Sequence, residues 1–300
     1  MKTLQIKNIL IPTDFSKTSL LAVEHAAFMA RLYKADLYLL HAVEISEATY
    51  SIYDPAVVIK DLPEIEDLVK SQLDELAKKL KKEYHITVKT LCTEGKASAE
   101  IVTAVRENDI DIVVMGTHGV SGFDEFFLGS NAHRTVTVCP CPVITVQGHA
   151  KKIGFTNIVM PIDDSLHSRQ KVDYTIALAK KFAARIHILG LLDKDRGAEL
   201  KKFKIKIESV EKAVKKSGLT YETKIVKGNN LAVEATKYSK KVKADLIVVL
   251  TDHESRLTGM FLGAFAKQIV NHSKIPVMSI RPMEGIYDSV SLAAANPFEN

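Results

Sequence analysis

The chain has 300 residues, of which 46% are hydrophobic, and a formal net charge of +5. This length is typical of about two domains, and this apolar content excludes a wholly disordered chain. No apolar run approaches the ~20 residues that a membrane-spanning helix needs. The first 14 residues lack the apolar core of a secretory signal, because Asn8, Pro12 and Asp14 interrupt it. We therefore expect a cytoplasmic protein without a membrane anchor.

Strands and helices alternate along the first half of the chain. Apolar runs predict strands near 6–12, 36–43, 87–93, 111–117 and 142–146, and helices are expected near 17–34, 63–83, 97–108 and 129–138. Ser16 can cap the first of these helices. Continuous apolar strands such as Ile112–Met115 are typical of a parallel sheet that helices cover on both faces. Residues 45–62 are an insertion that we interpret as a surface loop rather than a flap over a site.

The second half repeats the first. Ile9–Asp14 (ILIPTD) recurs as Ile158–Asp163 (IVMPID), and three further segments recur in the same order, with strands expected near 157–161, 185–192, 220–226, 245–251 and 276–280. The fold class is therefore α/β, with two doubly wound, parallel, five-stranded sheets in tandem. We place the first domain at 1–147, the second at 156–282 and a tail at 283–300.

A glycine-rich connection follows the fourth strand. Gly116 and Gly119 flank Thr117 and His118, and Gly129-Ser130 follows Gly119 after nine intervening residues, at the start of a helix. Glycine lets a backbone approach a phosphate closely, and a helix N-terminus supplies free N–H groups and the positive end of a dipole. The pattern G-x2-G-x9-G-S resembles the nucleotide-binding loop of the universal stress protein family.

The likeness to a tandem universal stress protein covers residues 4–281 and implies two adenine nucleotide alpha hydrolase-like, Rossmann-like domains. It implies that the first domain binds ATP at the carboxyl ends of its strands. The end of the first strand would line the adenine and ribose, Ala42 would pack against the base, the glycine loop would wrap the ribose and phosphates, and Ser130 would donate to phosphate. The nucleotide-binding residues implied in this way are Pro12, Thr13, Asp14, Phe15, Ala42, Met115, Gly116, His118, Gly119, Gly129, Ser130 and Asn131.

Several of these residues have a second interpretation. Asp14 could accept from ribose hydroxyls or hold Mg²⁺ or Mn²⁺ with the nucleotide, or it could be a turn residue that caps the helix. Ser130 could be a plain helix cap, and His118 a neutral surface histidine. The set as a whole therefore carries the prediction better than any single member.

The second half departs from this pattern. Alignment of the strands sets Leu250 against Gly116, His253 against Gly119 and Ala264 against Ser130, whereas Gly263 matches Gly129. Bulkier side chains would take the space of ribose or phosphate, so we expect no ATP there. The run Asp252-His253-Glu254 suggests a metal site, but adjacent residues seldom converge on one ion, which favours an exposed turn.

Two further features have competing interpretations. Cys139 and Cys141 are spaced C-x-C with no second cysteine pair or histidine cluster, which favours structural cysteines over a metal or redox site. Residues 1–150 carry 15 Lys and Arg against 20 Asp and Glu, whereas residues 151–300 carry 26 against 16. Part of this excess lies at Lys201–Lys206, where apolar residues at helical spacing favour a solvated helix face over a nucleic-acid site.

Three functions are compatible with these features. We favour an ATP-binding regulatory protein of the stress response, in which no Walker-type lysine and no evident base promote hydrolysis, so that any turnover is slow. An adenylating ligase would need an SGG-type loop where Pro12–Ser16 stands. A tandem scaffold would act by protein–protein contact alone. Its two domains would pair through their last strands, within one chain or in a homodimer, and an unknown protein partner would bind to it.

Overall fold

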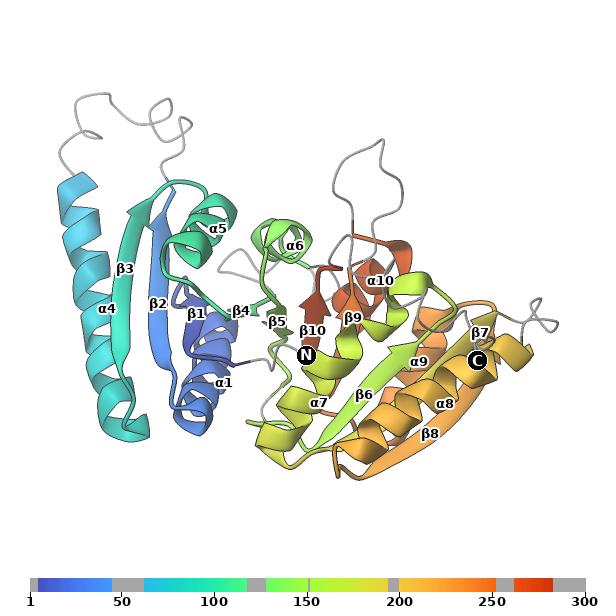
Figure 1. Ribbon diagram of the computed structural model, residues 1–300. Coiled ribbons are helices and arrows are strands. Elements are labelled where there is room, and N and C mark those ends of the chain that lie inside the picture. The colour runs from blue at the N-terminus through green and yellow to red at the C-terminus, as the bar shows by residue number, and fades with distance from the viewer. Residues whose placement is uncertain are drawn as a thin grey trace, which may run out of the picture.

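The computed structural model describes residues 5–44, 62–117, 128–150, 152–193, 200–251 and 262–282, with backbone alone for residues 62, 63 and 166 (Figure 1). Strands and helices alternate in the first half. They are β1 (Asn8–Pro12), α1 (Lys17–Tyr33), β2 (Asp36–Val43), α4 (Leu62–Tyr84), β3 (Val88–Glu94), α5 (Ala97–Glu107), β4 (Ile112–Gly116), α6 (Ser130–Val138) and β5 (Val143–Val146). The insertion expected at 45–62 lies outside the described residues except for Leu62, which begins α4, and the tail at 283–300 lies wholly outside them.

The second half follows the same order, with one added turn. Its elements are β6 (Asn157–Ile162), a 3₁₀ turn η1 (Leu166–Arg169), α7 (Lys171–Phe182), β7 (Arg185–Asp193), α8 (Leu200–Lys216), β8 (Tyr221–Gly228), α9 (Leu231–Lys241), β9 (Leu246–Leu250), α10 (Ala264–His272) and β10 (Val277–Ile280). The turn η1 stands where the first half already has the first turn of α1. The duplication expected from the sequence is therefore seen element by element.

The two five-stranded parallel sheets join edge to edge into one sheet. The strand order is β3-β2-β1-β4-β5-β10-β9-β6-β7-β8. Neighbours within each half are parallel, whereas β5 and β10 are antiparallel, with Met278 opposite Ile144. The expected meeting of the two last strands is confirmed. Antiparallel pairing of equivalent edges relates the halves by an approximate two-fold axis and leaves β3 and β8 as the outer edges.

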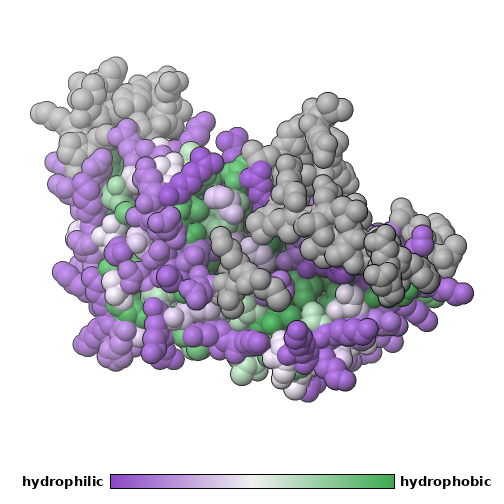
Figure 2. Space-filling view, viewed as in Figure 1, coloured by the Kyte–Doolittle hydropathy of each residue, from purple (hydrophilic) through white to green (hydrophobic). Residues whose placement is uncertain are grey.

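Helices cover both faces of this sheet, and the strands are accordingly buried. The side chains of β1, β4, β6 and β9 alternate between two apolar clusters, one beneath α1, α4, α7 and α8 and the other beneath α5, α6, α9 and α10. The exposed side of α4 is largely hydrophilic (Figure 2), with Ile65 and Leu68 as exposed apolar residues near its start. Phe203, Ile207, Val210 and Val214 form the buried stripe of α8, as their spacing predicted. No helix within the described ranges is both long and apolar enough to cross a membrane.

An aromatic cluster packs α1 against the connection between the halves. Phe155 is 1% exposed, and its ring centroid lies 5.0 Å from that of Phe182 and 6.0 Å from that of His25. The His25 Nε2 atom lies 3.0 Å from the carbonyl oxygen of Ala150. Because a carbonyl only accepts, Nε2 carries the proton, and this bond ties the connection to α1.

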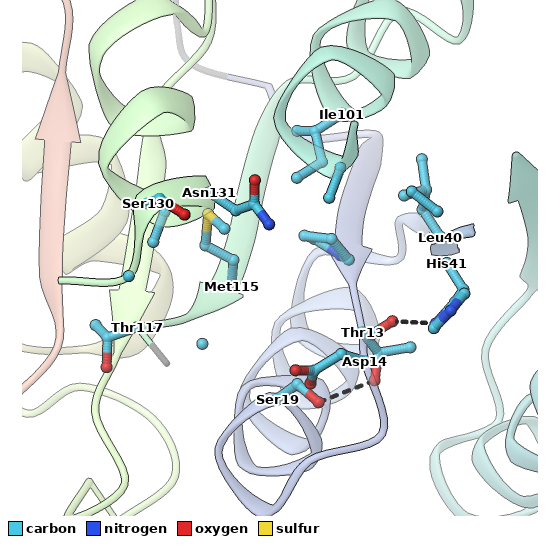
Figure 3. Close-up of a pocket in the computed structure, with 16 residues that line it drawn as sticks. Thr13, Asp14, Ser19, Leu40, His41, Ile101, Met115, Thr117, Ser130 and Asn131 are labelled. Atoms are coloured by element: carbon cyan, nitrogen blue, oxygen red, sulfur yellow. Dashed lines mark hydrogen bonds between the residues drawn. The ribbon is translucent and has the colours of Figure 1, made fainter. Parts of the chain in front are cut away.

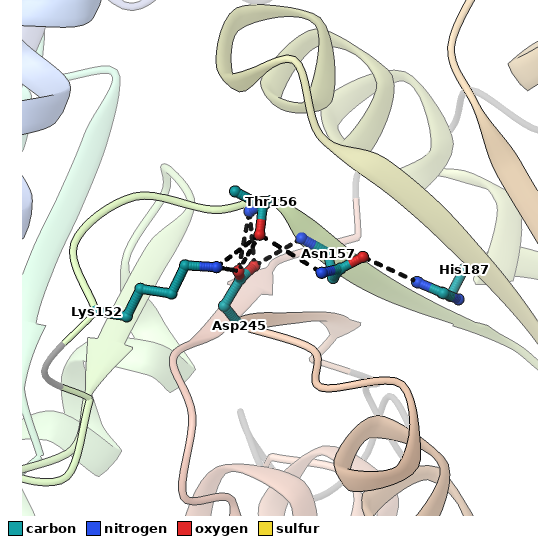
Figure 4. Close-up of polar contacts among 5 residues, drawn as sticks. All are labelled: Lys152, Thr156, Asn157, His187 and Asp245. Carbon is teal, nitrogen blue, oxygen red and sulfur yellow. Dashed lines mark hydrogen bonds and ion pairs between the residues drawn. The ribbon is translucent and has the colours of Figure 1, made fainter.

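A buried carboxylate fixes the start of β6 in the second half. Asp245 accepts from the backbone N–H groups of Thr156 and Asn157, both at 2.9 Å, and from Lys152 Nζ at 2.6 Å (Figure 4). Asp111 occupies the equivalent place in the first half, where it accepts from the N–H of Lys7 at 2.6 Å and of Asn8 at 3.0 Å. The repeated aspartate thus satisfies the N–H groups at the start of the central strand in both halves.

His25 makes stability dependent on pH. Burial lowers its pKa below the ordinary 6.5, although the bond to Ala150 and the charge of Glu24 act in the opposite direction. The unfolded chain takes up a proton as the pH falls through 6.5 while the folded chain resists it, so the free energy of unfolding should decrease there. In His25→Gln, which keeps a donor but does not titrate, denaturant unfolding should show a flatter profile between about pH 7 and about pH 5. An unchanged profile, or equal flattening by exposed His149→Gln, would contradict this role.

The carboxylate of Asp245 should contribute far more to stability than its lysine partner. Asp245→Ala leaves buried N–H groups unpaired and should lower the free energy of unfolding by about 3 kcal/mol. The Lys152 side chain is 59% exposed, so Lys152→Met should cost less than about 1 kcal/mol. Urea unfolding of both variants measures the two changes. Similar losses in both would show that the ion pair, and not the backbone bonds, carries the stabilisation.

Candidate functional site

A pocket opens at the point of the first half where the strand order reverses. Its volume is about 380 Å³, within the range of small-molecule sites. The carboxyl ends of β1, β2 and β4 and the N-terminal turns of α1, α5 and α6 form its wall. Strands β1 and β4 lie side by side there, while their helices leave on opposite faces, and this arrangement creates a crevice in doubly wound sheets. We call this cavity the first-half pocket.

The first-half pocket has two distinct sides (Figure 3). Ser130 and Asn131 from α6 lie on one side, Leu40 and His41 from β2 lie on the other, and Asp14 lies at the base between them. Helix α5 contributes Ala97 and Ile101 at successive turns. One wall is therefore mainly apolar, and the opposite wall offers helix N–H groups and polar side chains.

Hydrogen bonds hold the turn between β1 and α1 in a strained conformation. Thr13 is buried, and its hydroxyl lies 3.0 Å from that of Ser19 and accepts from the N–H of Phe15 at 3.1 Å. Phe15 has φ of +60°, which is rare for a bulky residue. The carboxylate of Asp14 accepts from the N–H of Ser16 at 3.1 Å, while Ser16 caps α1 by accepting from the N–H of Ser19. The turn thereby presents Asp14 to the pocket.

His41 connects β2 to this turn. Its Nδ1 atom lies 2.8 Å from the carbonyl oxygen of Thr13 and so donates to it. Its ring stacks on Phe15 with centroids 5.2 Å apart and planes at 22°. The stack accounts for the place of Phe15, which does not line the pocket but supports His41, a lining residue.

Gly116 is required where β4 ends because α1 approaches it closely. A Cβ atom built on Gly116 would lie 3.1 Å from the backbone nitrogen of Ser19 and 3.2 Å from its Cα. These are backbone atoms of the first turn of α1, so they cannot yield as a flexible side chain would. A side chain here would push α1 away from the pocket.

The N-terminus of α6 faces the pocket without a side-chain cap. Gly129 is the N-cap residue and offers no side chain, while Ser130, Asn131 and Ala132 line the pocket. The first N–H groups of a helix have no acceptor within the helix and carry partial positive charge. The N–H of Gly129 donates to the carbonyl of Thr117 at 2.8 Å, which joins β4 to α6. This wall can accept an anion.

The structure brings most of the implied nucleotide-binding residues together. Nine of them line the first-half pocket: Pro12, Thr13, Asp14, Ala42, Met115, Gly116, Gly129, Ser130 and Asn131. His118 and Gly119 lie outside the described residues. The sequence analysis did not single out Ser19, Leu40, Ala97, Ile101 and Ala132, which also line the pocket. Ser19 lies one turn after the capping Ser16, and Ala97 and Ile101 lie four apart on one helix face, but these spacings fit packing against the sheet as well as a pocket.

Apolar side chains fill the equivalent places of the second half. Strand register sets Leu191 against Ala42, because Pro161 pairs with Leu189 as Pro12 pairs with Leu40. Leu250 ends β9 as Gly116 ends β4. Leu191 and Leu250 are 1% and 4% exposed and belong to the apolar clusters of the core. The turn η1 stands where α1 would meet the Leu250 side chain.

Charged residues pack beneath the turn after β6. Burial raises the Asp163 pKa, but the ammonium of Lys171 and hydrogen bonds from Ser165 and Ser168 outweigh this and hold the pKa below its usual 3.8. Lys171 is 3% exposed and follows the η1 turn. Lys206 Nζ from α8 donates to the carbonyls of Asp163 at 3.1 Å and Ser165 at 2.7 Å. Asp163 is thus engaged in an internal charge network, whereas its counterpart Asp14 lines a pocket.

Both halves of the chain match the same protein family. The family model described as "Universal stress protein family" matches residues 5–147 and again residues 154–281. The chain belongs to the universal stress protein family. A tandem member, universal stress protein Slr1230 of Synechocystis, is 24% identical over 300 aligned residues that cover 92% of this chain and all of that protein.

The chain also resembles shorter relatives and several solved structures. Universal stress protein MJ0531 of Methanocaldococcus jannaschii is 35% identical over 149 residues, covering 49% of this chain and 85% of that protein. A universal stress protein structure from Archaeoglobus fulgidus covers 94% of this chain and 99% of its own with a TM-score of 0.74 at 17% identity, a likeness of fold. Another universal stress protein was solved in complex with cAMP, at 25% identity over 42% of this chain and 97% of its own, with a TM-score of 0.35.

Gly116→Val should lower stability, because its branched side chain would meet the backbone of α1. We expect a loss of about 1–3 kcal/mol in the free energy of unfolding, measured by urea unfolding. Gly148→Ala is the matched control, since a Cβ there would lie 3.5 Å from the Thr18 hydroxyl, an ordinary contact. Equal stability of Gly116→Val and the native chain would show that α1 can move away without cost.

Proposed function

We propose that this protein is a nucleotide-binding regulator in which the first half binds ATP and the second half does not. One contrast carries the proposal. The first half has a pocket between an uncapped helix N-terminus and the apolar end of β2, whereas leucines fill the equivalent places of the second half. Both halves share one fold, so the difference lies in the side chains at the strand ends.

The two sides of the first-half pocket suit the two ends of a nucleotide. Leu40, Ala42 and Ile101 offer an apolar wall for the flat faces of adenine. The N–H groups that begin α6, with the Ser130 hydroxyl, offer donors for phosphate oxygens. Asp14 can accept from ribose hydroxyls at the base of the pocket. His118 and Gly119 would add contacts from the glycine loop, as the family likeness implies.

Asp14 would take part in binding a divalent cation together with the nucleotide. Among the residues that the structure describes, no three His, Cys, Asp or Glu side chains converge on a possible metal position. A Mg²⁺ or Mn²⁺ ion would therefore take most of its ligands from phosphate oxygens and water, with Asp14 as one protein ligand. The ion would neutralise phosphate charge, while α6 holds the phosphates in place.

We infer a binding function in the stress response rather than an efficient hydrolase. The described lining of the pocket contains neither a lysine nor an arginine, and His41 already donates its Nδ1 proton to a backbone carbonyl. Hydrolysis would then depend on the metal ion and should be slow. A protein partner in the cytoplasm, or a second copy of the chain, would bind differently to the nucleotide-bound and the nucleotide-free protein.

Isothermal titration with Mg-ATP tests the proposal. We expect about one ATP bound per chain. Ala42→Leu introduces the residue that the second half has at the equivalent position. It should weaken ATP binding at least tenfold, about 1.4 kcal/mol, because the larger side chain enters the pocket. Leu191→Ala makes the reverse change at the equivalent place and should leave the affinity of the first half unchanged.

Glycines at the two helix N-caps give a second matched pair. Gly129→Val should abolish binding, whereas Gly263→Val should leave one ATP per chain. Two ATP per chain, or full binding by both Ala42→Leu and Gly129→Val, would refute the assignment of the site. Failure of the native chain to bind ATP would favour the tandem scaffold instead.

A further inference from the structure

Two thiols lie close together at the end of α6 that is away from the first-half pocket. Cys139 is the C-cap of α6, and Cys141 precedes β5 with Pro140 between them. Their Sγ atoms are 3.6 Å apart. A disulfide bond needs about 2.05 Å, so the sulfurs would have to approach by roughly 1.5 Å, through side-chain rotation together with a shift of the backbone at Cys139.

The two thiols differ in accessibility. Cys139 is 1% exposed, whereas Cys141 is half-buried. Cys141 and Pro140 line a surface hollow of about 330 Å³, together with Arg106, Asp109 and Asp111. A small solute can therefore reach Cys141 from the hollow, and Cys139 lies behind it.

The pair is also uneven in acidity. The hydrogen bond from Cys141 lowers the Cys139 pKa, with a further contribution from the charge of Arg281. The same hydrogen bond and burial raise the Cys141 pKa. Arg281 follows β10 of the second half, and its Nη1 atom donates to the carbonyl of Val138 at 3.4 Å. Residues of both halves thus surround the buried thiol.

We propose that Cys139 and Cys141 form a redox site that a hydroperoxide oxidises to a disulfide. The Cys139 thiolate first takes the proton of the accessible Cys141 thiol across the 3.6 Å between their Sγ atoms, and the Cys141 thiolate formed in this way attacks one peroxide oxygen. The O–O bond breaks, the leaving oxygen takes the proton back from Cys139 and departs as water or an alcohol, and Cys141 is left as a sulfenic acid. The Cys139 thiolate then attacks the Cys141 sulfur, the S–O bond breaks, and hydroxide leaves as water after taking a proton. In sum, two thiols lose two electrons and two protons, and the hydroperoxide is reduced.

Oxidation at this site should affect the opposite end of α6. The helix is nine residues long, with Ser130 at its pocket end and Cys139 at its other end. Closing the disulfide requires the C-cap to move toward Cys141, and a rigid helix transmits that movement to its N-terminus. This coupling rests on the proposed nucleotide site, whereas formation of the disulfide does not.

Thiol titration after peroxide treatment tests the redox site. Cys92 is the third cysteine, so the reduced Cys92→Ser protein is treated with hydrogen peroxide, unfolded and titrated. Free thiols should fall from two to none, the peptide spanning 139–141 should lose two hydrogen atoms in mass, and dithiothreitol should restore both thiols. Two thiols remaining, a sulfinic acid on Cys141 without a disulfide, or a disulfide between chains would overturn the proposal.

Single-thiol variants separate the two roles. In Cys92→Ser/Cys139→Ser, the accessible Cys141 should form a sulfenic acid that dimedone traps. In Cys92→Ser/Cys141→Ser, the buried Cys139 should stay reduced, and its oxidation at an equal rate would contradict the proposed order of attack. Titration of oxidised and reduced Cys92→Ser protein with Mg-ATP should show affinities that differ about fivefold or more. Absence of ATP binding in both forms would count against the nucleotide site alone.

Discussion

The approach of α1 to the end of β4 is the contact on which the first-half pocket depends. A Cβ atom on residue 116 would lie 3.1 Å from the backbone nitrogen of Ser19, so glycine lets the first turn of α1 pack beside the crevice without displacement. That turn carries the Ser16 cap and supports Thr13, and it thereby fixes Asp14 at the base of the pocket. In the second half, Leu250 ends the equivalent strand and the 3₁₀ turn η1 replaces the first helical turn. The close approach of α1 at Gly116 thus accompanies an open crevice, and Leu250 with the η1 turn accompanies a filled one.

Duplication gave the chain a second edge strand, β10, that pairs with β5, and a second helix, α10, equivalent to α6. The two halves then diverged. Pairing of β5 with β10 makes one sheet from two and buries both edges. The aspartates at the starts of β4 and β9 were kept, because the N–H groups they satisfy are needed for the fold in either half. The strand ends line a pocket in the first half, whereas leucines fill the equivalent places in the second half. Lys206 and Lys171 around Asp163 stabilise the second half from within.

The sequence predicted the alternation, the duplication and the meeting of the last strands because continuous apolar runs and repeated motifs report directly on buried parallel strands. It located Asp14, Gly116 and Gly129 through the glycine pattern and the family resemblance that this pattern carries, although Asp14 alone fitted a turn residue as well. It did not predict the place of Phe15, whose φ of +60° and stack on His41 arise from tertiary contacts. Nor did it predict Ala97 and Ile101, since apolar residues on a helix face look the same whether they meet a sheet or a ligand. The proximity of the two thiols depends on the bend at Pro140, which spacing alone cannot give.

A crystal structure of the chain grown with excess Mg-ATP tests the central claim most directly, because it reports on both halves at once. We expect one nucleotide per chain, in the crevice between β1 and β4, with its phosphates at the N–H groups that begin α6 and its base against Ala42. The second half should keep Leu191 and Leu250 packed in the core, with no nucleotide beside them. An empty first crevice, or nucleotide bound alike in both halves, would contradict the account.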